Sequence, residues 1–144
     1  MLRVKHLLTD KEFGTQVWTV QAEAPVLEAI RIMADKRIGA LPVMRDTELV
    51  GIVSERDYAR KVILQGKTSA QTAVSEIMTA QVITVRAEDT VHHCMQLMTE
   101  KRIRHLPVLE QDQLVGMVSI GDLVKAVMDE QQQTIVQLER YIAG

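Results

Sequence analysis

The chain has 144 residues, 47% hydrophobic and only 3% aromatic, which suffices for one compact domain or two small halves. Its formal net charge of −2 and sequence pI of about 6.1 argue against nucleic acid or a membrane surface as partner. No apolar run reaches the roughly 18 residues of a membrane span, the charged N-terminal segment is unlike a signal peptide, and Cys94 is the only cysteine. We therefore expect a cytoplasmic protein without a disulfide.

An internal repeat organises the sequence. Residues 17–63 align with residues 82–128 at a constant offset of 65, and 20 of the 47 aligned pairs are identical. Upstream, residues 4–9 resemble residues 74–79 at an offset of 70, and the difference falls in a predicted loop at 10–16. A repeat that cannot bury its own apolar face needs its copy to cover it, so we expect the function where the copies meet.

Each copy predicts a strand followed by a helix. The β-branched segments 17–20 and 82–85 favour short strands. Helical spacing of apolar residues follows each of them. Pro25 suits the first helical position in one copy and Asp89 suits the N-cap in the other.

A hairpin and a second helix complete each copy. Pro42 and Pro107 mark the beginning of the first hairpin strand, and the second helices start at Ser54 and Ser119. We divide the chain into repeat 1 with its lead-in (1–64), a polar linker (65–73), repeat 2 (74–128) and a C-terminal helical extension (129–144). The extension has an intermittent apolar stripe, and packing on its own domain or on a partner both remain open.

Three motifs occur twice in the same order. They are a strand ending in Thr-Val, a Leu-Pro-Val strand, and Gly-x-x-Ser-x-x-Asp, which ends at Asp57 and Asp122. Together they resemble a tandem pair of cystathionine β-synthase (CBS) domains, the Bateman module, of the stand-alone bacterial type. The resemblance covers residues 4–128 and implies an α+β fold of two pseudo-symmetric βαββα repeats packed through their sheets.

The Ser-x-x-Asp pairs permit two interpretations. Ser54 with Asp57, and Ser119 with Asp122, match the capping-box pattern of a helix N-terminus. The resemblance implies a second role, in which the Asp accepts hydrogen bonds from the ribose hydroxyls of an adenosine ligand. The helix start beside the Ser would favour a phosphate. Both roles can hold together.

The resemblance also implies composite sites. Asp57 would share a site with Thr84, Arg104 and His105, whereas Asp122 would share one with the less basic set of Thr19, Gly39 and Ala40. The first site would therefore bind phosphate better. The complete predicted ligand-binding set is Thr19, Val20, Gly39, Ala40, Leu41, Ser54, Arg56, Asp57, Thr84, Val85, Arg104, His105, Leu106, Ser119, Ile120 and Asp122.

The ligand implied is an adenosine compound, with AMP as the first expectation and ATP, ADP or NAD(H) as alternatives. Occupancy would change the shape of a homodimer and so reach an unknown downstream protein. Two competing hypotheses are a ligand-free structural or dimerisation module and an enzyme with an unrecognised site.

Neither catalysis nor metal binding is expected. The sequence has no P-loop, no G-x-G-x-x-G and no nucleophile with an obvious local base. His92, His93 and Cys94 are consecutive, and adjacent helical side chains point about 100° apart, so they cannot converge on one ion.

Overall fold

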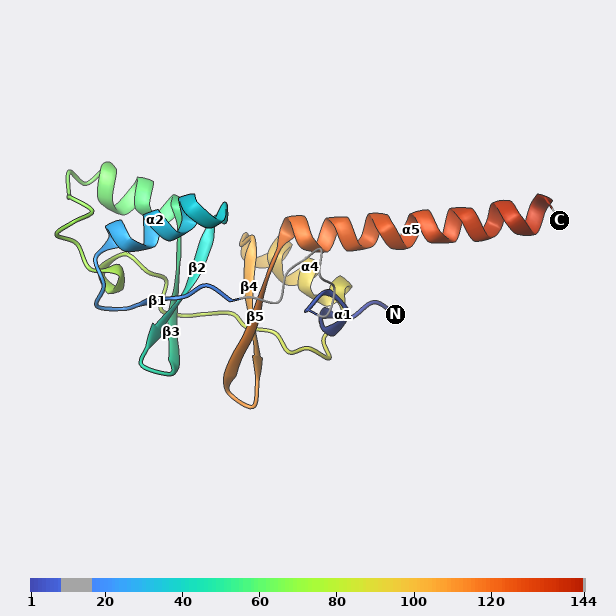
Figure 1. Ribbon diagram of the computed structural model, residues 1–144, viewed down its shortest axis with the longest axis horizontal. Coiled ribbons are helices and arrows are strands. Elements are labelled where there is room, and N and C mark those ends of the chain that lie inside the picture. The colour runs from blue at the N-terminus through green and yellow to red at the C-terminus, as the bar shows by residue number, and fades with distance from the viewer. Residues whose placement is uncertain (9–16, 144) are drawn as a thin grey trace.

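The computed structural model describes residues 1–8 and 17–143, and the predicted loop at 10–16 lies outside them. The two repeats form halves that lie side by side, and one long helix extends beyond the second half (Figure 1). The first half contains β1 (Val20–Gln21), α2 (Val26–Lys36), β2 (Ala40–Arg45), β3 (Glu48–Ser54), α3 (Glu55–Tyr58) and a π-helical turn (Ala59–Ile63). The second contains α4 (Val91–Lys101), β4 (His105–Glu110), β5 (Gln113–Ser119) and α5 (Ile120–Ala143), while α1 (Val4–Leu8) and a 3-10 turn (Val74–Glu76) are the lead-ins.

The sheets have the predicted hairpins, but their first strands are shorter than predicted. β2 pairs with β3 and β4 with β5, both antiparallel, and β1 lies parallel to β2. In the second half a single parallel bridge from Val85 to Val108 replaces the strand expected at 82–85. β-Propensity measures fit to a half-buried pleated surface, and only Val20 and Val85 of the two expected segments are buried.

Two predicted helix starts need small corrections. Pro25 is the residue before α2, and its extended ψ of 146° places it outside the helix. Thr90, not Asp89, caps α4, because its Oγ1 accepts a hydrogen bond from the His93 backbone N at 3.0 Å. Asp89 instead accepts from the Arg86 backbone N at 2.7 Å. Asp and Thr are both favourable N-cap residues, so the sequence alone did not show which of Asp89 and Thr90 caps α4.

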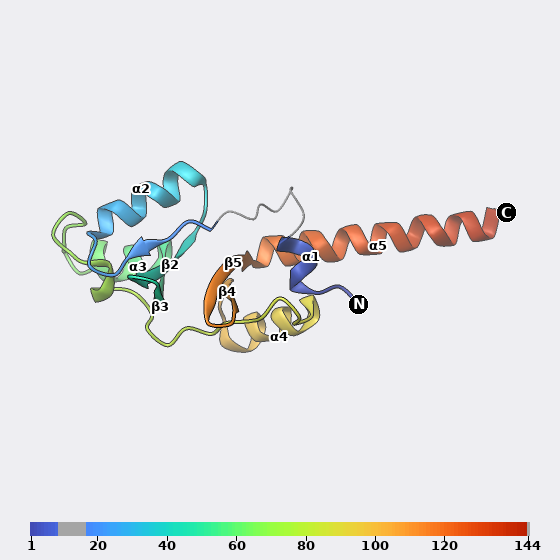
Figure 2. The ribbon, with the colours of Figure 1, turned by 60° about the horizontal axis from the view of Figure 1, so that its bottom comes forward.

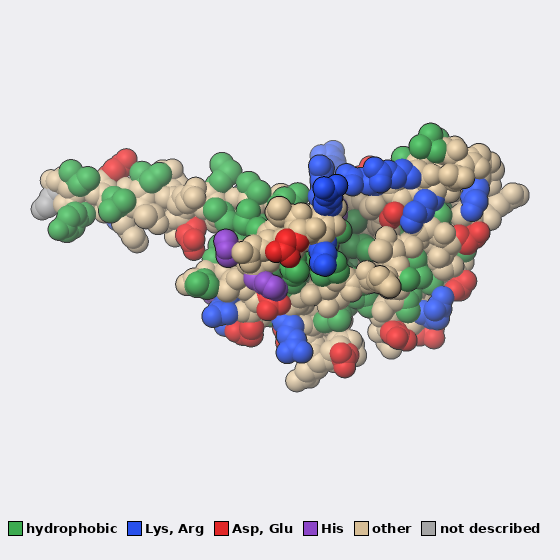
Figure 3. Space-filling view, turned by 180° about the vertical axis from the view of Figure 1, so that it is seen from behind, with side chains coloured by type: hydrophobic (Ala, Val, Ile, Leu, Met, Phe, Trp, Pro, Cys, Tyr) green, Lys and Arg blue, Asp and Glu red, His purple; other side chains and the backbone are tan. Residues whose placement is uncertain are grey.

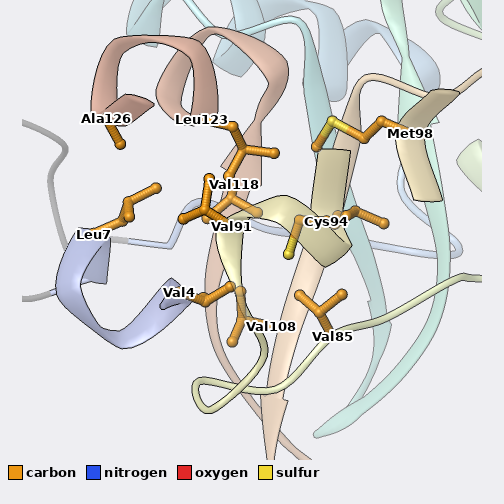
Figure 4. Close-up of a cluster of buried hydrophobic side chains, with 11 residues drawn as sticks. Val4, Leu7, Val85, Val91, Cys94, Met98, Val108, Val118, Leu123 and Ala126 are labelled. Carbon is orange, nitrogen blue, oxygen red and sulfur yellow. The ribbon is translucent and has the colours of Figure 1, made fainter. Parts of the chain in front are cut away.

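The first lead-in packs into the second half. Val4 and Leu7 of α1 are buried in one cluster with Val91 and Cys94 of α4 (Figure 4). The Val4 backbone N donates to the Asp89 carbonyl at 2.9 Å. Figure 2 likewise shows α1 beside α4 and α5, far from α2.

The second lead-in packs into the first half by the same arrangement. Val74 and Ile77 are buried among the residues of the first core, and the Val74 backbone N donates to the Ala24 carbonyl at 2.9 Å. The repeats therefore exchange their lead-ins. The division at 1–64 and 74–128 describes the sequence, while each core takes in a segment from the other side of the junction.

The repeated glycine of Gly-x-x-Ser-x-x-Asp makes room for these lead-ins. A Cβ on Gly51 would lie 2.5 Å from Met78 Sδ, and one on Gly116 would lie 2.5 Å from Leu8 Cδ2. Beside Gly51, Ile52 and Thr79 exchange backbone hydrogen bonds of 3.0 and 2.9 Å. The backbone O of Thr79 would lie only 3.1 Å from a Cβ on Gly51, so this close approach of the chain to β3 favours a residue without a side chain. At Gly116 the close contact is with the flexible end of the Leu8 side chain alone.

α5 is one continuous helix that carries both the end of repeat 2 and the expected extension. Leu123 and Ala126 are buried against the second core, and no residue between Val127 and Ala143 is buried. Beyond the body the helix projects away from both halves (Figure 1). Of the two alternatives for the extension, packing on its own domain is not what the structure shows. Within residues 1–8 and 17–143, no helix is long and apolar enough to cross a membrane.

Candidate functional site

A pocket of about 430 Å³ lies at the junction of the halves, within the size range of small-ligand sites. The first half contributes the residues before Leu-Pro-Val, two residues of β3 and the start of α3: Gly39, Ala40, Ile52, Ser54, Glu55, Arg56 and Asp57. The second half contributes the segment after the lead-in, the end of α4 and the start of β4: Thr79, Gln81, Val82, Ile83, Arg102, Ile103, Arg104, His105 and Pro107.

Both predicted capping boxes are present. The Ser54 backbone N donates to Asp57 Oδ2 at 2.9 Å, and the Asp57 backbone N donates to Ser54 Oγ at 3.2 Å. Ser119 and Asp122 repeat these bonds at 2.9 and 3.2 Å. The helix-capping interpretation is therefore confirmed, and it fixes the Asp57 carboxylate at the rim of the pocket.

Asp57 has an additional neighbour in Lys61, one turn further along the chain. Lys61 Nζ lies 3.5 Å from Asp57 Oδ1 and donates to the Ile77 carbonyl at 2.9 Å. The repeat places Ala126 at the position equivalent to Lys61. Capping uses Oδ2, so Oδ1 keeps lone pairs for a hydroxyl donor from the pocket.

The residues before Leu-Pro-Val are held at the helix starts by backbone bonds. The Glu55 N donates to the Gly39 carbonyl at 3.1 Å, and the Ile120 N donates to the Arg104 carbonyl at 2.9 Å. Across the junction, an ideal Cβ on Gly39 would lie 3.6 Å from Cε1 of His105. The imidazole thus reaches the first half and closes one side of the pocket.

His105 is held mainly in its neutral form. Burial lowers its pKa below the ordinary value of 6.5, and the positive charge of Arg104 lowers it further, while the carboxylate of Asp122 acts in the opposite direction. A phosphate placed beside the ring would supply the missing negative partner and favour the imidazolium.

Three guanidinium groups give the pocket its charge. Arg56, Arg102 and Arg104 line it, against the two carboxylates of Glu55 and Asp57, and Figure 3 shows Lys and Arg side chains grouped at the middle of the molecule. Guanidinium groups bind phosphate through paired hydrogen bonds. The arrangement is suited to hold an anionic ligand with a hydroxyl-bearing part near Asp57.

The structure brings together only part of the predicted ligand-binding set. Seven of those residues line the pocket: Gly39, Ala40, Ser54, Arg56, Asp57, Arg104 and His105. Gly39 and Ala40, which the resemblance grouped with Asp122, also line the pocket that contains Asp57.

The other predicted residues lie outside this pocket. Thr19, Thr84, Ser119, Ile120 and Asp122 do not line it, and Val82 and Ile83 take the place expected for Thr84. Four more are buried in the two cores, so only their backbone could meet a ligand: Val20, Leu41, Val85 and Leu106.

Sequence reasoning missed Arg102 and Glu55. Arg102 belongs to the Lys-Arg-Ile end of α4, where a cation has an ordinary explanation in the helix dipole. Its left-handed conformation, with φ of 55°, ends the helix beside the pocket. Glu55 directly follows the capping Ser54, and only the Gly39 contact, at 3.3 Å from an ideal Cβ to Oε1, reveals where it points.

Among the residues that the structure describes, no group of three or more His, Cys, Asp or Glu side chains is arranged to hold a metal ion. Cys94 is buried in the second core. Burial, with a smaller contribution from Asp89, raises the pKa of its thiol to about 11, which keeps it protonated and poorly reactive.

Comparison with known proteins finds one family that matches both repeats. The family model described as "CBS domain" matches residues 5–64 and 74–129. The mitochondrial CBS domain-containing protein CBSX3 of Arabidopsis thaliana is 43% identical over 136 residues, covering 91% of this chain, which spans 66% of that protein's length. A solved structure of a protein with CBS domains from Burkholderia ambifaria has a TM-score of 0.83 and 48% identity, covering 89% of this chain and 94% of that one.

Two further structures bear on ligands and assembly. A CBS domain pair solved in complex with 5′-methylthioadenosine and S-adenosyl-L-methionine is 27% identical, with a TM-score of 0.78 over 90% of this chain and 98% of that one. A hexameric CBS-CP12 protein from bloom-forming cyanobacteria is 30% identical, with a TM-score of 0.75 over 85% of this chain and 70% of that one.

Proposed function

The chain belongs to the CBS-domain family as a tandem pair, and from that premise we propose that it binds an adenine nucleotide in the junction pocket and signals its occupancy by a change of shape. The observation that carries the proposal is the meeting of Asp57 with Arg56, Arg102 and Arg104 in one pocket. A carboxylate can accept from a ribose diol, while guanidinium groups bind phosphate. AMP is the first candidate, followed by ADP, ATP and NAD(H).

A relative with bound adenosyl compounds supports the ligand class. Its ligands are methylthioadenosine and S-adenosylmethionine, which share the adenosine part with AMP and lack its phosphate. The three arginines of this pocket add a reason to prefer a phosphorylated adenosine. Ligand binding would shift the protein only through different affinities for two arrangements of the halves.

The experiment begins with the protein as purified. Absorbance near 260 nm that is released on denaturation, and identified by mass spectrometry, would reveal a bound nucleotide; with one Trp and two Tyr the protein's own absorbance is low. Nucleotide-free protein is then titrated with AMP, ADP, ATP, NAD and adenosine by calorimetry. Absence of binding by all five would overturn the proposal.

The second candidate is a ligand-free structural or dimerisation module. Both Ser–Asp pairs already satisfy each other as caps, and this observation favours it. Under that hypothesis Asp57→Ala lowers stability and changes nothing in any nucleotide titration. Binding lost in Asp57→Ala would rule it out.

We also propose that the module does not turn over its ligand, and that it acts in the cytoplasm on a downstream protein. Stand-alone CBS proteins are among its relatives. Among possible assemblies, a homodimer is the first to test.

The non-catalytic role is tested by incubation with ATP. Sustained AMP release from ATP that is lost in Asp57→Ala would overturn it.

A further inference from the structure

An apolar stripe runs along the projecting part of α5. Its members recur at alternating intervals of four and three residues: Val124, Met128, Gln131, Ile135, Leu138 and Ile142. The five apolar members are between 40% and 83% exposed. A strict 3.5-residue period is the signature of a coiled-coil seam, in which these are the alternating a and d positions.

Nothing in the part of the chain that the structure describes covers this stripe. The buried residues of α5 are Leu123 and Ala126, which lie about 100° or more around the helix from the nearest stripe residue in sequence. From Met128 onward the helix has no buried residue. Most of the stability of a helix in a protein comes from packing of its apolar face, so this exposed stripe is suited to a partner helix of the same period.

We propose that this stripe pairs with the α5 stripe of a second copy of the chain as an antiparallel two-stranded coiled coil. A second copy supplies the same 3.5-residue period along the same length, about 27 Å between residues 124 and 142 at 1.5 Å per residue. A twofold axis makes such a surface self-complementary. The inference rests on the homodimer proposed above and specifies the element that forms it.

Charge favours the antiparallel direction. In that arrangement Val124 packs against Ile142 of the partner subunit, and the flanking Lys125 and Glu139 bring opposite charges together twice. Lys125 lies 3.9 Å from Asp129 within one chain, and the three N–H donors of an ammonium group allow it to contact a second carboxylate as well. In a parallel pair the flanking positions facing Lys125 and Glu139 are Ile120 and Thr134, which carry no charge.

Gln131, the polar member of the stripe, is compatible with parallel or antiparallel helices. The two glutamines that follow it allow the helix direction to be measured. Gln131, Gln132 and Gln133 occupy three consecutive positions: the seam, its flank and the outer face. In the antiparallel pair Gln132 lies next to the twofold axis and faces its own copy across the seam. In a parallel pair Gln131 would face its copy instead, and Gln133 faces solvent in both.

Single cysteine replacements at these three glutamines test the proposal in the full-length chain. We expect Gln132→Cys to form the intermolecular disulfide at least tenfold faster than Gln131→Cys or Gln133→Cys under mild oxidation. Wild-type protein measures the contribution of Cys94, which is buried. Fastest cross-linking at position 131 would overturn the antiparallel pairing, and equal rates at all three would overturn a defined coiled coil.

Two adjacent residues provide a matched control for the stripe itself. Ile135 lies on it, whereas Val136 lies on the outer face, so Ile135→Asp and Val136→Asp place the same acid on the same helix one position apart. Sedimentation equilibrium should show at least tenfold weaker association for Ile135→Asp and wild-type association for Val136→Asp. Circular dichroism and thermal unfolding confirm that the body of each variant remains folded.

If the wild type is a dimer, and Ile135→Asp and Val136→Asp associate equally well, the coiled coil is overturned and the homodimer must form through another surface. A wild-type monomer would overturn both. Association of α5 with a different protein, with no self-association at tens of micromolar, would also overturn it.

Discussion

At the scale of single residues, Asp57 combines a structural and a recognition role. Its Oδ2 accepts from the backbone N and the hydroxyl of Ser54 at 2.9 and 3.1 Å, while Oδ1 faces Lys61 at 3.5 Å. The same carboxylate therefore caps α3 and borders the pocket. A change that keeps an oxygen but removes the charge should separate the two roles.

We predict that Asp57→Asn keeps most of the stability and loses ligand. The amide oxygen can still accept from Ser54, whereas Asp57→Ala removes the cap and should cost about 0.5–2 kcal/mol in the free energy of unfolding. Loss of a charged hydrogen bond to ribose should weaken AMP binding about 10- to 100-fold in both. Urea unfolding and calorimetry measure the two effects. Unchanged AMP affinity in Asp57→Asn, with Asp122→Asn as the control, would contradict the ribose role.

His105 should make nucleotide binding depend on pH. In the free protein burial and Arg104 lower its pKa, and a bound phosphate raises it again, so binding takes up a proton. AMP affinity should be highest below the free-state pKa and fall as pH rises through the bound-state pKa. Calorimetry between about pH 5 and 8 measures this.

Two controls isolate the imidazole. Adenosine has no phosphate, so its affinity should change little over the same range. AMP itself loses a proton near pH 6, which acts in the opposite direction, and His105→Gln measures that contribution alone. If His105→Gln and wild type show the same pH profile, the imidazole does not contact the phosphate.

At the scale of elements, each exchanged lead-in places one buried valine in the core that it enters, so that each core can be destabilised separately by the same substitution. Val4 of α1 is buried with Cys94, while Val74 occupies the equivalent place in the other core. We predict that Val4→Ala accelerates labelling of Cys94 by a thiol reagent about tenfold or more, because the cavity lowers the cost of opening the second core. Val74→Ala, the same change in the first core, should accelerate it much less.

Equal acceleration by Val4→Ala and Val74→Ala would contradict independent opening of the two cores. Both variants should lose a similar amount of global stability, about 1–3 kcal/mol, so urea unfolding provides the common reference. A difference in labelling at equal global stability would locate α1 in the second core in solution.

The hairpins, the helices and the capping boxes could be predicted because repeated local patterns determine them. The Leu-Pro-Val strands pair as expected with the strands that end at Ser54 and Ser119. The lead-in exchange could not be predicted, since the offset of 70 shows that two segments are alike without showing which core each enters. The place of Arg102 in the pocket could not be predicted for a similar reason, because a cation at a helix end has the same local sequence pattern whether or not it borders a pocket.

At the scale of the whole molecule, pseudo-symmetry is broken where the two repeats differ in charge. Arg56, Arg104 and His105 line the junction pocket, and the equivalent positions in the other copy are Gly121, Gly39 and Ala40. Only Arg102 has a basic equivalent, Arg37. A twofold-related second site at Asp122 would therefore lack most of the phosphate-binding groups.

We predict two sites of unequal selectivity. A charge-assisted hydrogen bond to phosphate contributes about 1.5–3 kcal/mol, so the Asp57 site should prefer AMP to adenosine by tenfold or more, whereas a site at Asp122 should discriminate little. Calorimetry with both ligands on wild type, Asp57→Ala, Asp122→Ala and the double variant Arg104→Ala/His105→Ala measures this. Asp122→Ala should keep the preference for AMP, and the double variant should lose it while still binding adenosine. If Asp57→Ala and Asp122→Ala lose AMP equally and the double variant binds like wild type, the two sites are equivalent and the charge difference has no role in recognition.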